Sequence, residues 1–250
     1  MYTLKKSLGQ HFLKDKEAIE KILEALKIHE FEQLLEVGPG AGALTEHLIH
    51  IPAINFKAVE LDEEKISYLK KKYPVLEDKI ISADFLNIES PFSGSFHVIG
   101  NFPYNISTQI LFKVVEWKEQ VPVVVGMFQK EVAERAAAKS GSKTYGVLSV
   151  LIQAFYDVRY LFDVPPESFN PPPKVMSGVI ELKRKSELLS YKSEASFFRL
   201  VKTAFNQRRK TLRNAVRGIF DPEVLNDEIF NKRAEQLTIQ QFAELTHLMR

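Results

Sequence analysis

The stretch Leu34-Leu35-Glu36-Val37-Gly38-Pro39-Gly40-Ala41-Gly42 runs from a short apolar segment into a cluster of glycines. The apolar segment has the length and composition of a buried strand, and a helical pattern follows the glycines. Because glycine has no Cβ, a turn at Gly38 and Gly40 lets the backbone pass close to a ligand, and the next helix presents unpaired N–H groups to it. Taken alone, the cluster is also compatible with a tight strand-to-helix turn that binds nothing.

Two acidic residues follow the next two expected strands. Glu60 comes 22 positions after Gly38, where a carboxylate can accept hydrogen bonds from both ribose hydroxyls of an adenosine. Asp84 ends the third strand, where it can accept a hydrogen bond from the exocyclic amine of an adenine. Since the carboxyl ends of parallel strands meet at one edge of a sheet, the glycine turn and both acids are expected in one crevice. Either acid alone is equally typical of a solvated strand end.

The crevice fits either a nicotinamide dinucleotide or S-adenosylmethionine. The glycines are spaced Gly-x-Gly-x-Gly, and the dinucleotide fingerprint Gly-x-Gly-x-x-Gly fails at its last position, which is Ala43. The spacing therefore favours S-adenosylmethionine, and we expect no metal in the site. Glu36 has two open interpretations: a carboxylate near the sulfonium of the cofactor, or a residue that orients the glycine loop.

The fourth expected strand ends in Asn101-Phe102-Pro103-Tyr104. An adenine N6 is a poor nucleophile because its lone pair is delocalised into the ring, so its alkylation requires acceptors that hold the amine hydrogens. The Asn101 side-chain oxygen and the Phe102 carbonyl can serve, on a turn that Pro103 stiffens. Tyr104 offers a ring for base stacking, worth roughly 1–3 kcal/mol. The alternative is an ordinary proline-containing turn with a surface tyrosine.

Composition sets limits on the class of protein. The chain has 250 residues, of which 45% are hydrophobic and 26% charged, as in ordinary globular proteins. The apolar run Val121–Phe128 is far shorter than a membrane-spanning helix. The basic N-terminus has no apolar stretch behind it, so we expect no secretion signal and a cytoplasmic protein. The absence of cysteine excludes disulfides, thiolate metal sites and cysteine nucleophiles.

The pattern along the chain predicts two domains, residues 1–185 and 186–250. The first alternates helical and β-rich segments, which is typical of an α/β fold with a parallel sheet, and the second is helical throughout. We expect the last two strands to form a hairpin at one sheet edge. The seven strands expected are 34–37, 56–61, 79–82, 96–100, 122–126, 147–156 and 175–183.

The basic residues are concentrated in the second domain. Residues 1–182 carry a net charge of −4 and residues 183–250 one of +6. Between Arg199 and Arg217 there are seven basic residues and no acidic one, which indicates a polyanionic partner. If residues 206–219 form one helix, Arg209, Arg213 and Arg217 share a face beside an apolar stripe. A solvated helix face is the alternative.

At this point the sequence resembles the ribosomal RNA adenine dimethyltransferases over nearly its whole length. The residues that carry the resemblance lie in seven motifs, which are Ser7-Leu-Gly-Gln-His-Phe-Leu13, Glu36-Val-Gly-Pro-Gly40, Val59-Glu-Leu-Asp62, Asn101-Phe-Pro-Tyr-Asn-Ile-Ser107, Gln129-Lys-Glu-Val132, Pro171-Pro-Pro-Lys-Val175 and Phe205-Asn-Gln-Arg-Arg-Lys-Thr211. The resemblance implies a Rossmann-like, S-adenosylmethionine-dependent methyltransferase domain followed by a small helical domain. It also implies two methyl groups on each of two adjacent adenosines near the 3′ end of small-subunit rRNA, and a role in subunit biogenesis.

The resemblance also assigns site residues. The cofactor positions that it implies are Gln10, His11, Leu13, Gly38, Glu60, Asp84 and Asn101. The catalytic positions are Asn101, Phe102, Tyr104 and Phe169, the last as a second aromatic wall for the base; a phenylalanine that caps the core is the alternative. The expected RNA-binding positions come from the basic stretch described above and not from the resemblance; they are Arg208, Arg209, Lys210, Arg213 and Arg217. His11 stands where many members have asparagine, and Phe102 where many have leucine.

The expected partners are small-subunit rRNA and the immature small subunit, bound by a monomer, with no membrane. Three rival functions share parts of the pattern. A DNA adenine methyltransferase has the same amine chemistry, a nicotinamide oxidoreductase the same glycine turn, and a non-catalytic ribosome assembly factor the same basic surface.

Overall fold

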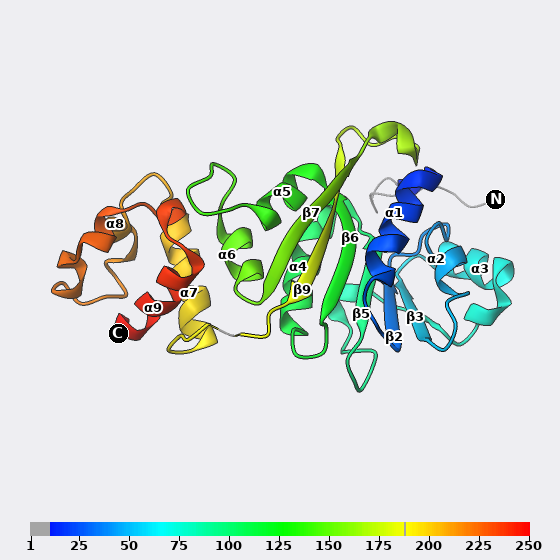
Figure 1. Cartoon of the computed structure of the whole chain (residues 1–250), viewed down its shortest axis with the longest axis horizontal. Coiled ribbons are helices and arrows are strands. Elements are labelled where there is room, and N and C mark those ends of the chain that lie inside the picture. Colours follow the sequence, from blue (N-terminus) through cyan, green and yellow to red (C-terminus); the bar gives the residue numbers. More distant parts are fainter. Residues whose placement is uncertain (1–10, 188) are drawn as a thin grey trace. The chain divides into compact units, whose positions relative to one another are not determined.

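The computed structural model describes residues 11–187 and 189–250, which form two compact units. The first unit comprises the described residues up to Ala133 together with Val158–Arg184. The second comprises Glu134–Asp157 and the described residues from Lys185 onward. Figure 1 shows a sheet with helices in the first unit and an assembly of short helices in the second.

The segment 134–157 is placed differently from the expected division at residue 185. In the structure it groups with the C-terminal residues, although it precedes the last strands of the sheet in the chain. Its helix α6 (Val147–Gln153) packs against α7 (Glu194–Asn206), and the Lys185 N–H donates to the Phe155 carbonyl at 2.9 Å. The chain therefore passes from the first unit into the second at residue 134, returns to the first unit for residues 158–184, and continues in the second unit from residue 185.

The first unit is built on a seven-stranded sheet in the order β4-β3-β2-β5-β6-β9-β7. The pairs β2–β3, β2–β5, β3–β4 and β5–β6 are parallel, and β6–β9 is antiparallel. Two strands from the end of the first unit, β9 and β7, are neighbours at one edge, but β7 is not the segment 147–156 that was expected there. The strands are β2 (Gln33–Val37), β3 (Asn55–Glu60), β4 (Ile80–Ser82), β5 (His97–Asn101), β6 (Val123–Gln129), β7 (Tyr156–Val164) and β9 (Ser177–Arg184).

A second, two-stranded sheet ties the beginning of the described chain to a distant loop. Strand β1 (Phe12–Leu13) pairs antiparallel with β8 (Phe169–Asn170), with Leu13 opposite Phe169. Leu13 and Phe169 are both buried in the apolar core, with exposed fractions of 4% and 1%. Residues 11–13 also lie beside the carboxyl end of β5. There the Asn101 side-chain amide donates a hydrogen bond to the His11 carbonyl.

Helices flank the sheet, and two of them, α1 and α3, begin at an aspartate that caps the first turn. Helix α1 buries Ile19, Ile22 and Leu26 and is capped by Asp15, whose Oδ1 accepts from the Ala18 N–H at 3.2 Å. In Figure 1, α1 lies in front of the sheet and α4 behind it. The helices from this part of the chain are α1 (Lys16–Lys27), α2 (Thr45–Leu48), α3 (Glu63–Lys72), α4 (Ser107–Glu116) and α5 (Lys130–Ala137).

The strand expected at 147–156 is wrong. Residues 147–153 form helix α6, and the edge strand β7 begins only at Tyr156. Residues 148–152 are buried on all sides, and a short run of that kind has the same apolar pattern in a buried helix as in a buried strand. Helix α6 begins after Gly146, whose N–H donates to Ser149 Oγ at 3.0 Å.

The second unit packs α6 against α7, which in turn contacts α8 (Leu212–Val216) and α9 (Ile239–Leu245). Thr238 caps α9, and its hydroxyl oxygen accepts from the Gln241 N–H at 3.1 Å. The single helix expected over 206–219 is wrong, because α7 ends at Asn206 and α8 begins only after Thr211, which is extended. No helix in the part of the chain described here is long and apolar enough to cross a membrane.

Candidate active site

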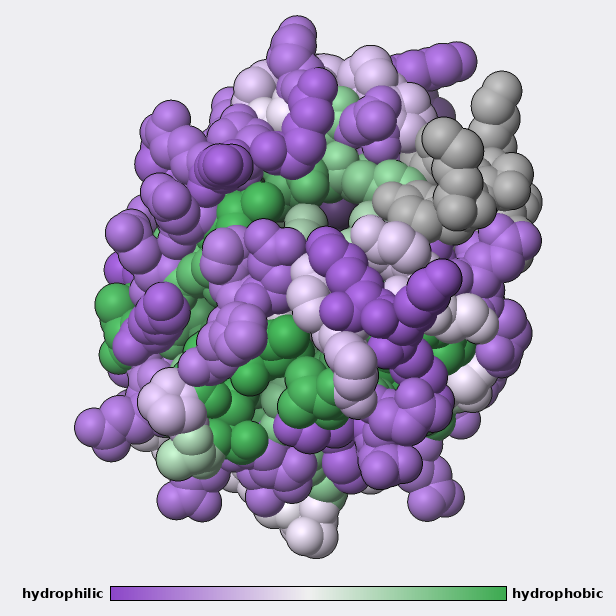
Figure 2. Space-filling model, turned by 90° about the vertical axis from the view of Figure 1, so that its right-hand side faces the viewer, coloured by the Kyte–Doolittle hydropathy of each residue, from purple (hydrophilic) through white to green (hydrophobic). Residues whose placement is uncertain are grey.

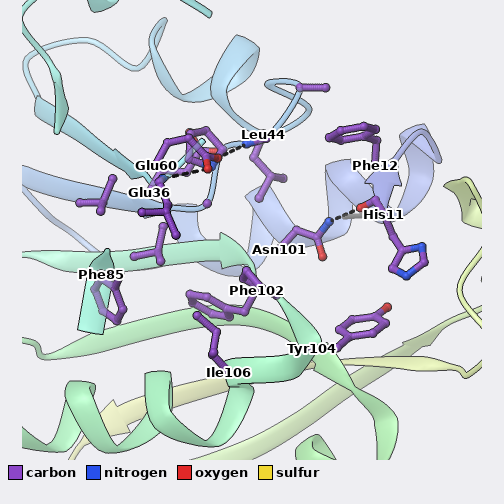
Figure 3. Close-up of a pocket in the computed structure, with 18 of the residues that line it drawn as sticks. His11, Phe12, Glu36, Leu44, Glu60, Phe85, Asn101, Phe102, Tyr104 and Ile106 are labelled. Atoms are coloured by element: carbon purple, nitrogen blue, oxygen red, sulfur yellow. Dashed lines mark hydrogen bonds between the residues drawn. The ribbon is translucent and has the colours of Figure 1, made fainter. Parts of the chain in front are cut away.

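A cavity opens at the carboxyl ends of β2, β3 and β5 and beside the 3-10 segment that follows β4. Parallel strands point these ends to one edge of the sheet, so the loops after them meet there. Residues 11–13 close another wall. Figure 3 shows the side chains that line this cavity, and Figure 2 shows that apolar side chains lie exposed among polar ones on the side of the molecule that carries α2 and α3.

The glycine loop forms the floor of the cavity. Gly38 and Gly40 have φ angles of +68° and +57°, a region that favours glycine. A Cβ at Gly40 would lie 3.3 Å from the Phe12 ring, and the Gly38 N–H donates to the Val59 carbonyl at 2.9 Å. The turn therefore requires glycine for both its backbone conformation and its close contacts.

Glu60 organises the glycine loop from the end of β3. Its Oε1 accepts from the N–H groups of Leu61 and Asp62 at 2.9 and 3.0 Å, and its Oε2 accepts from Gly40 at 3.1 Å. A carboxylate oxygen has two lone pairs, so Oε2 keeps one for a ligand hydroxyl. The predicted carboxylate is therefore in the cavity, and it also holds the loop in place.

Asp84 lies at the cavity wall after β4, as predicted. Its Oδ1 accepts from the Leu86 N–H at 3.0 Å and its Oδ2 from Asn87 Nδ2 at 2.9 Å. These bonds cap a 3-10 turn and fix the direction of the carboxylate. The turn also brings Phe85 and Leu86 to the cavity wall. Neither residue is among the predicted site residues.

Glu36 is 2% exposed and accepts a hydrogen bond from the Thr45 hydroxyl at 2.7 Å. Thr45 is the first residue of α2, so this bond ties β2 to the helix that follows the glycine loop. Burial raises the pKa of Glu36 to about 8, and the nearby charge of Glu60 adds to the rise. Of the two interpretations left open by the sequence, this geometry supports the one in which Glu36 orients the loop.

The raised pKa of Glu36 gives a pH prediction. Between its ordinary pKa of 4.5 and about 8 the unfolded carboxyl is ionised and the folded one is protonated, so folding takes up a proton and stability falls as pH rises, by at most about 1.4 kcal/mol per pH unit. Glu36→Gln does not titrate, so its denaturant midpoint should fall less between pH 5 and 8 than that of the wild type. Exposed Glu20→Gln is the control. Equal slopes for the wild type and Glu36→Gln would show that Glu36 is ionised in the fold.

Asn101 is held at the end of β5 by its own amide group. Its Nδ2 donates to the His11 carbonyl at 3.1 Å, so Oδ1 points away from His11 into the cavity (Figure 3). The next residue is anchored as well, because the Phe102 N–H donates to the Met127 carbonyl at 3.0 Å. Two acceptors, Asn101 Oδ1 and the Phe102 carbonyl, therefore follow β5 in a fixed backbone.

The Phe102 side chain is buried beneath the site and does not face a ligand. It is 1% exposed and stacks on Phe128 with ring centroids 4.7 Å apart. A Cβ at Gly126 would lie 2.2 Å from the Phe102 ring, and one at Gly100 would lie 2.9 Å from it. These two glycines make room for the ring, and no local signal in the sequence connects them with the site.

The aromatic wall differs from the expected one. Tyr104 lines the cavity, and its hydroxyl hydrogen-bonds to Ser177. The ring that faces it is the His11 imidazole, at a centroid distance of 5.7 Å and an angle of 28°, with His11 Nδ1 2.9 Å from the Pro171 carbonyl oxygen. Phe169 does not line this cavity: its pairing with Leu13 directs it into the core. The structure thus has the core phenylalanine that was the alternative.

The remaining predicted site residues are placed as follows. Leu13 lines the cavity, and Gln10 lies outside the described residues. Of the predicted RNA-binding residues, Arg208, Arg209, Lys210 and Arg217 are exposed. Arg213, at the start of α8, is half-buried. Arg209 lies between α7 and α8, so Arg209, Arg213 and Arg217 do not share the face of one helix.

A sequence profile of the ribosomal RNA adenine dimethylase family matches residues 1–249. The chain belongs to this family. It is therefore a methyltransferase, and the interpretation as a nicotinamide oxidoreductase is wrong.

Two curated relatives carry the name ribosomal RNA small subunit methyltransferase A. The one from Cytophaga hutchinsonii is 53% identical over 98% of this chain and 96% of its own length. The one from Flavobacterium johnsoniae is 51% identical over 97% and 94%. Within the ribosomal RNA adenine dimethylase family, this chain is thus similar to bacterial members over their full length.

Solved structures agree with this fold. A dimethyladenosine transferase from Plasmodium falciparum has a TM-score of 0.79 and 26% identity over 96% of this chain and 99% of its own. The 23S rRNA methyltransferase ErmE has a TM-score of 0.70 and 22% identity over 93% and 99%, which is a likeness of fold. The expected α/β methyltransferase fold with a helical C-terminal part is confirmed.

Proposed function

We propose that this member of the ribosomal RNA adenine dimethylase family transfers methyl groups from S-adenosylmethionine to N6 of two adjacent adenosines near the 3′ end of small-subunit rRNA. The product is N6,N6-dimethyladenosine, and the substrate is rRNA in immature small subunits in the cytoplasm. The observation that carries the proposal is the aim of Asn101 Oδ1 into a cavity that also contains the glycine loop and Glu60. We propose that the protein acts as a monomer.

The cavity suits S-adenosylmethionine on two counts. The glycine turn presents backbone without a Cβ to the cavity, and Glu60 Oε2 keeps a lone pair for a ribose hydroxyl. Gly38, Glu60, Asp84 and residues 11–13 would hold it, with Leu61, 53% exposed, at the rim. When bound, the cofactor supplies an electrophilic methyl group on a sulfonium.

The residues after β5 prepare the amine. Asn101 Oδ1 and the Phe102 carbonyl each accept one N6 hydrogen, which favours a pyramidal nitrogen whose lone pair is directed at the methyl carbon. As the N–CH3 bond forms, the S–CH3 bond would break and leave a neutral thioether. No general base is needed, because the amine proton is acidic once the nitrogen carries the new bond and would pass to water. Catalysis then comes from positioning and from fixed dipoles. The His11 carbonyl contributes by fixing which amide atom of Asn101 faces the substrate.

A labelling experiment tests the proposal. Unmodified small subunits are incubated with S-adenosylmethionine labelled on the methyl group, and the nucleosides of the RNA are analysed. We expect the label in N6,N6-dimethyladenosine. Label in DNA but not in subunits would select a DNA adenine methyltransferase, and binding to subunits without any product would select an assembly factor.

The contact between His11 and Tyr104 gives a second expected result. The two rings are stacked with their centroids 5.7 Å apart, which leaves no room for a base between them. The imidazole must move before a base stacks on this face of Tyr104, at a cost of about 0.5–1.5 kcal/mol. His11→Ala should lower the KM for RNA about 2- to 10-fold, with the Kd of S-adenosylmethionine unchanged because the backbone carbonyl remains.

Exposed His50→Ala is the matched control for this experiment. A base analogue whose fluorescence is quenched on stacking, placed at the target position, reports base capture directly. A higher KM for His11→Ala would mean that the ring supports the bound base and does not occupy its place.

A further inference from the structure

The loop between α5 and α6 lies against the basic segment of the second unit. We call residues Lys139–Thr144 the basic loop. Arg208 Nη2 donates to the Lys143 carbonyl at 2.5 Å, and the Gly141 N–H donates to the Glu235 carbonyl at 2.7 Å. Both partners belong to the C-terminal part of the chain, so the fold joins segments that are 65 residues apart in the first case.

The basic loop carries positive charge and no acid. From residue 135 to residue 156 there are three basic residues and no acidic one. Lys139 and Lys143 are exposed, and no carboxylate among the described residues pairs with either ammonium group. Ser140 and Thr144 are exposed beside them. Ammonium and hydroxyl donors of this kind contact phosphate oxygens in protein complexes with nucleic acids.

The loop is held in one conformation at both ends. Ser142 Oγ donates to the Lys139 carbonyl at 2.8 Å, and Gly141 adopts a φ of +86°. Tyr145, directly after the loop, is 1% exposed and contacts the Phe205 ring of α7 edge-on at 6.1 Å. A loop that is already ordered loses little conformational entropy when it binds.

We propose that the basic loop contacts the phosphate backbone of the substrate RNA together with Arg208, Arg209 and Lys210, as one continuous cationic surface. The inference rests on the proposed function and adds a segment to its RNA interface. In sequence the loop falls among the residues of the methyltransferase domain, far from the charge cluster. Lys139 and Lys143 supply the phosphate contacts, and Arg208 holds the loop beside its own segment.

The test is the salt dependence of RNA binding. Affinity for a small-subunit RNA fragment is measured between 50 and 300 mM KCl for the wild type, Arg209→Ala and the double variant Lys139→Ala/Lys143→Ala. Each phosphate contact contributes about 0.7–0.9 to the slope of log affinity against log salt. We expect the double variant to bind more weakly and its slope to be shallower by about 1.4–1.8. The cofactor Kd and Tm should be unchanged.

The control is Lys27→Ala/Lys71→Ala, two exposed lysines of the first unit. An unchanged slope in the loop variant, with a shallower slope in Arg209→Ala, would overturn the inference and leave the proposed function intact. An equal loss of slope in the control would overturn it as well, because the effect would then be one of net charge. Failure of the wild type to bind or methylate RNA would instead contradict the proposed function.

Discussion

Asn101→Ala is expected to lower kcat for methyl transfer by about 10²- to 10³-fold, the usual effect of removing one fixed polar group that acts on the transition state. The variant loses the oxygen aimed into the cavity and the bond to the His11 carbonyl. RNA affinity should stay within about twofold, because the exposed cations are untouched. Single-turnover methylation with saturating cofactor and subunits measures the effect on the chemical step.

Asn55→Ala is the matched control for Asn101→Ala. Asn55 is an exposed asparagine at the start of β3, away from the carboxyl ends of the strands that carry the cavity. It should retain wild-type kcat. Full activity in Asn101→Ala would remove the basis for amine activation by this residue, and a loss confined to cofactor affinity would give Asn101 a role in binding alone.

Glu60→Gln is expected to weaken the binding of S-adenosylmethionine by about 30- to 100-fold, corresponding to roughly 2–3 kcal/mol. Glu60 uses both oxygens to accept three backbone N–H groups, from Gly40, Leu61 and Asp62. An amide has one oxygen and places an N–H donor against one of these donors. The glycine loop is then held less firmly, and the acceptor for the ribose loses its charge.

Calorimetric titration with S-adenosylmethionine measures this loss, and RNA binding in the absence of cofactor should be unaffected. Glu89→Gln, an exposed glutamate, is the matched control. A Kd within about twofold of the wild type would mean that the carboxylate contributes nothing to the cofactor and serves the loop alone. A lower Tm with an unchanged Kd would lead to the same conclusion.

The local signals in the sequence predicted the parallel part of the fold and most of the candidate site. Buried runs ending in Val37, Glu60 and Asn101 form strands, because such choices depend on residues a few positions apart. The glycine turn and the acid after β3 could also be assigned to one site, for a different reason. The carboxyl ends of neighbouring parallel strands meet whatever the details of packing.

The sequence by itself therefore determined the class of fold, the glycine turn with its carboxylates, the Asn101 motif and the charge of the second unit. The tertiary structure alone decided that residues 147–153 are helical, that Phe169 lies in the core while His11 faces Tyr104, and that the basic loop lies against Arg208. Each of these depends on contacts between segments many residues apart. Such contacts are set by which surfaces the whole chain buries together, and a local pattern of polar and apolar residues does not contain that information.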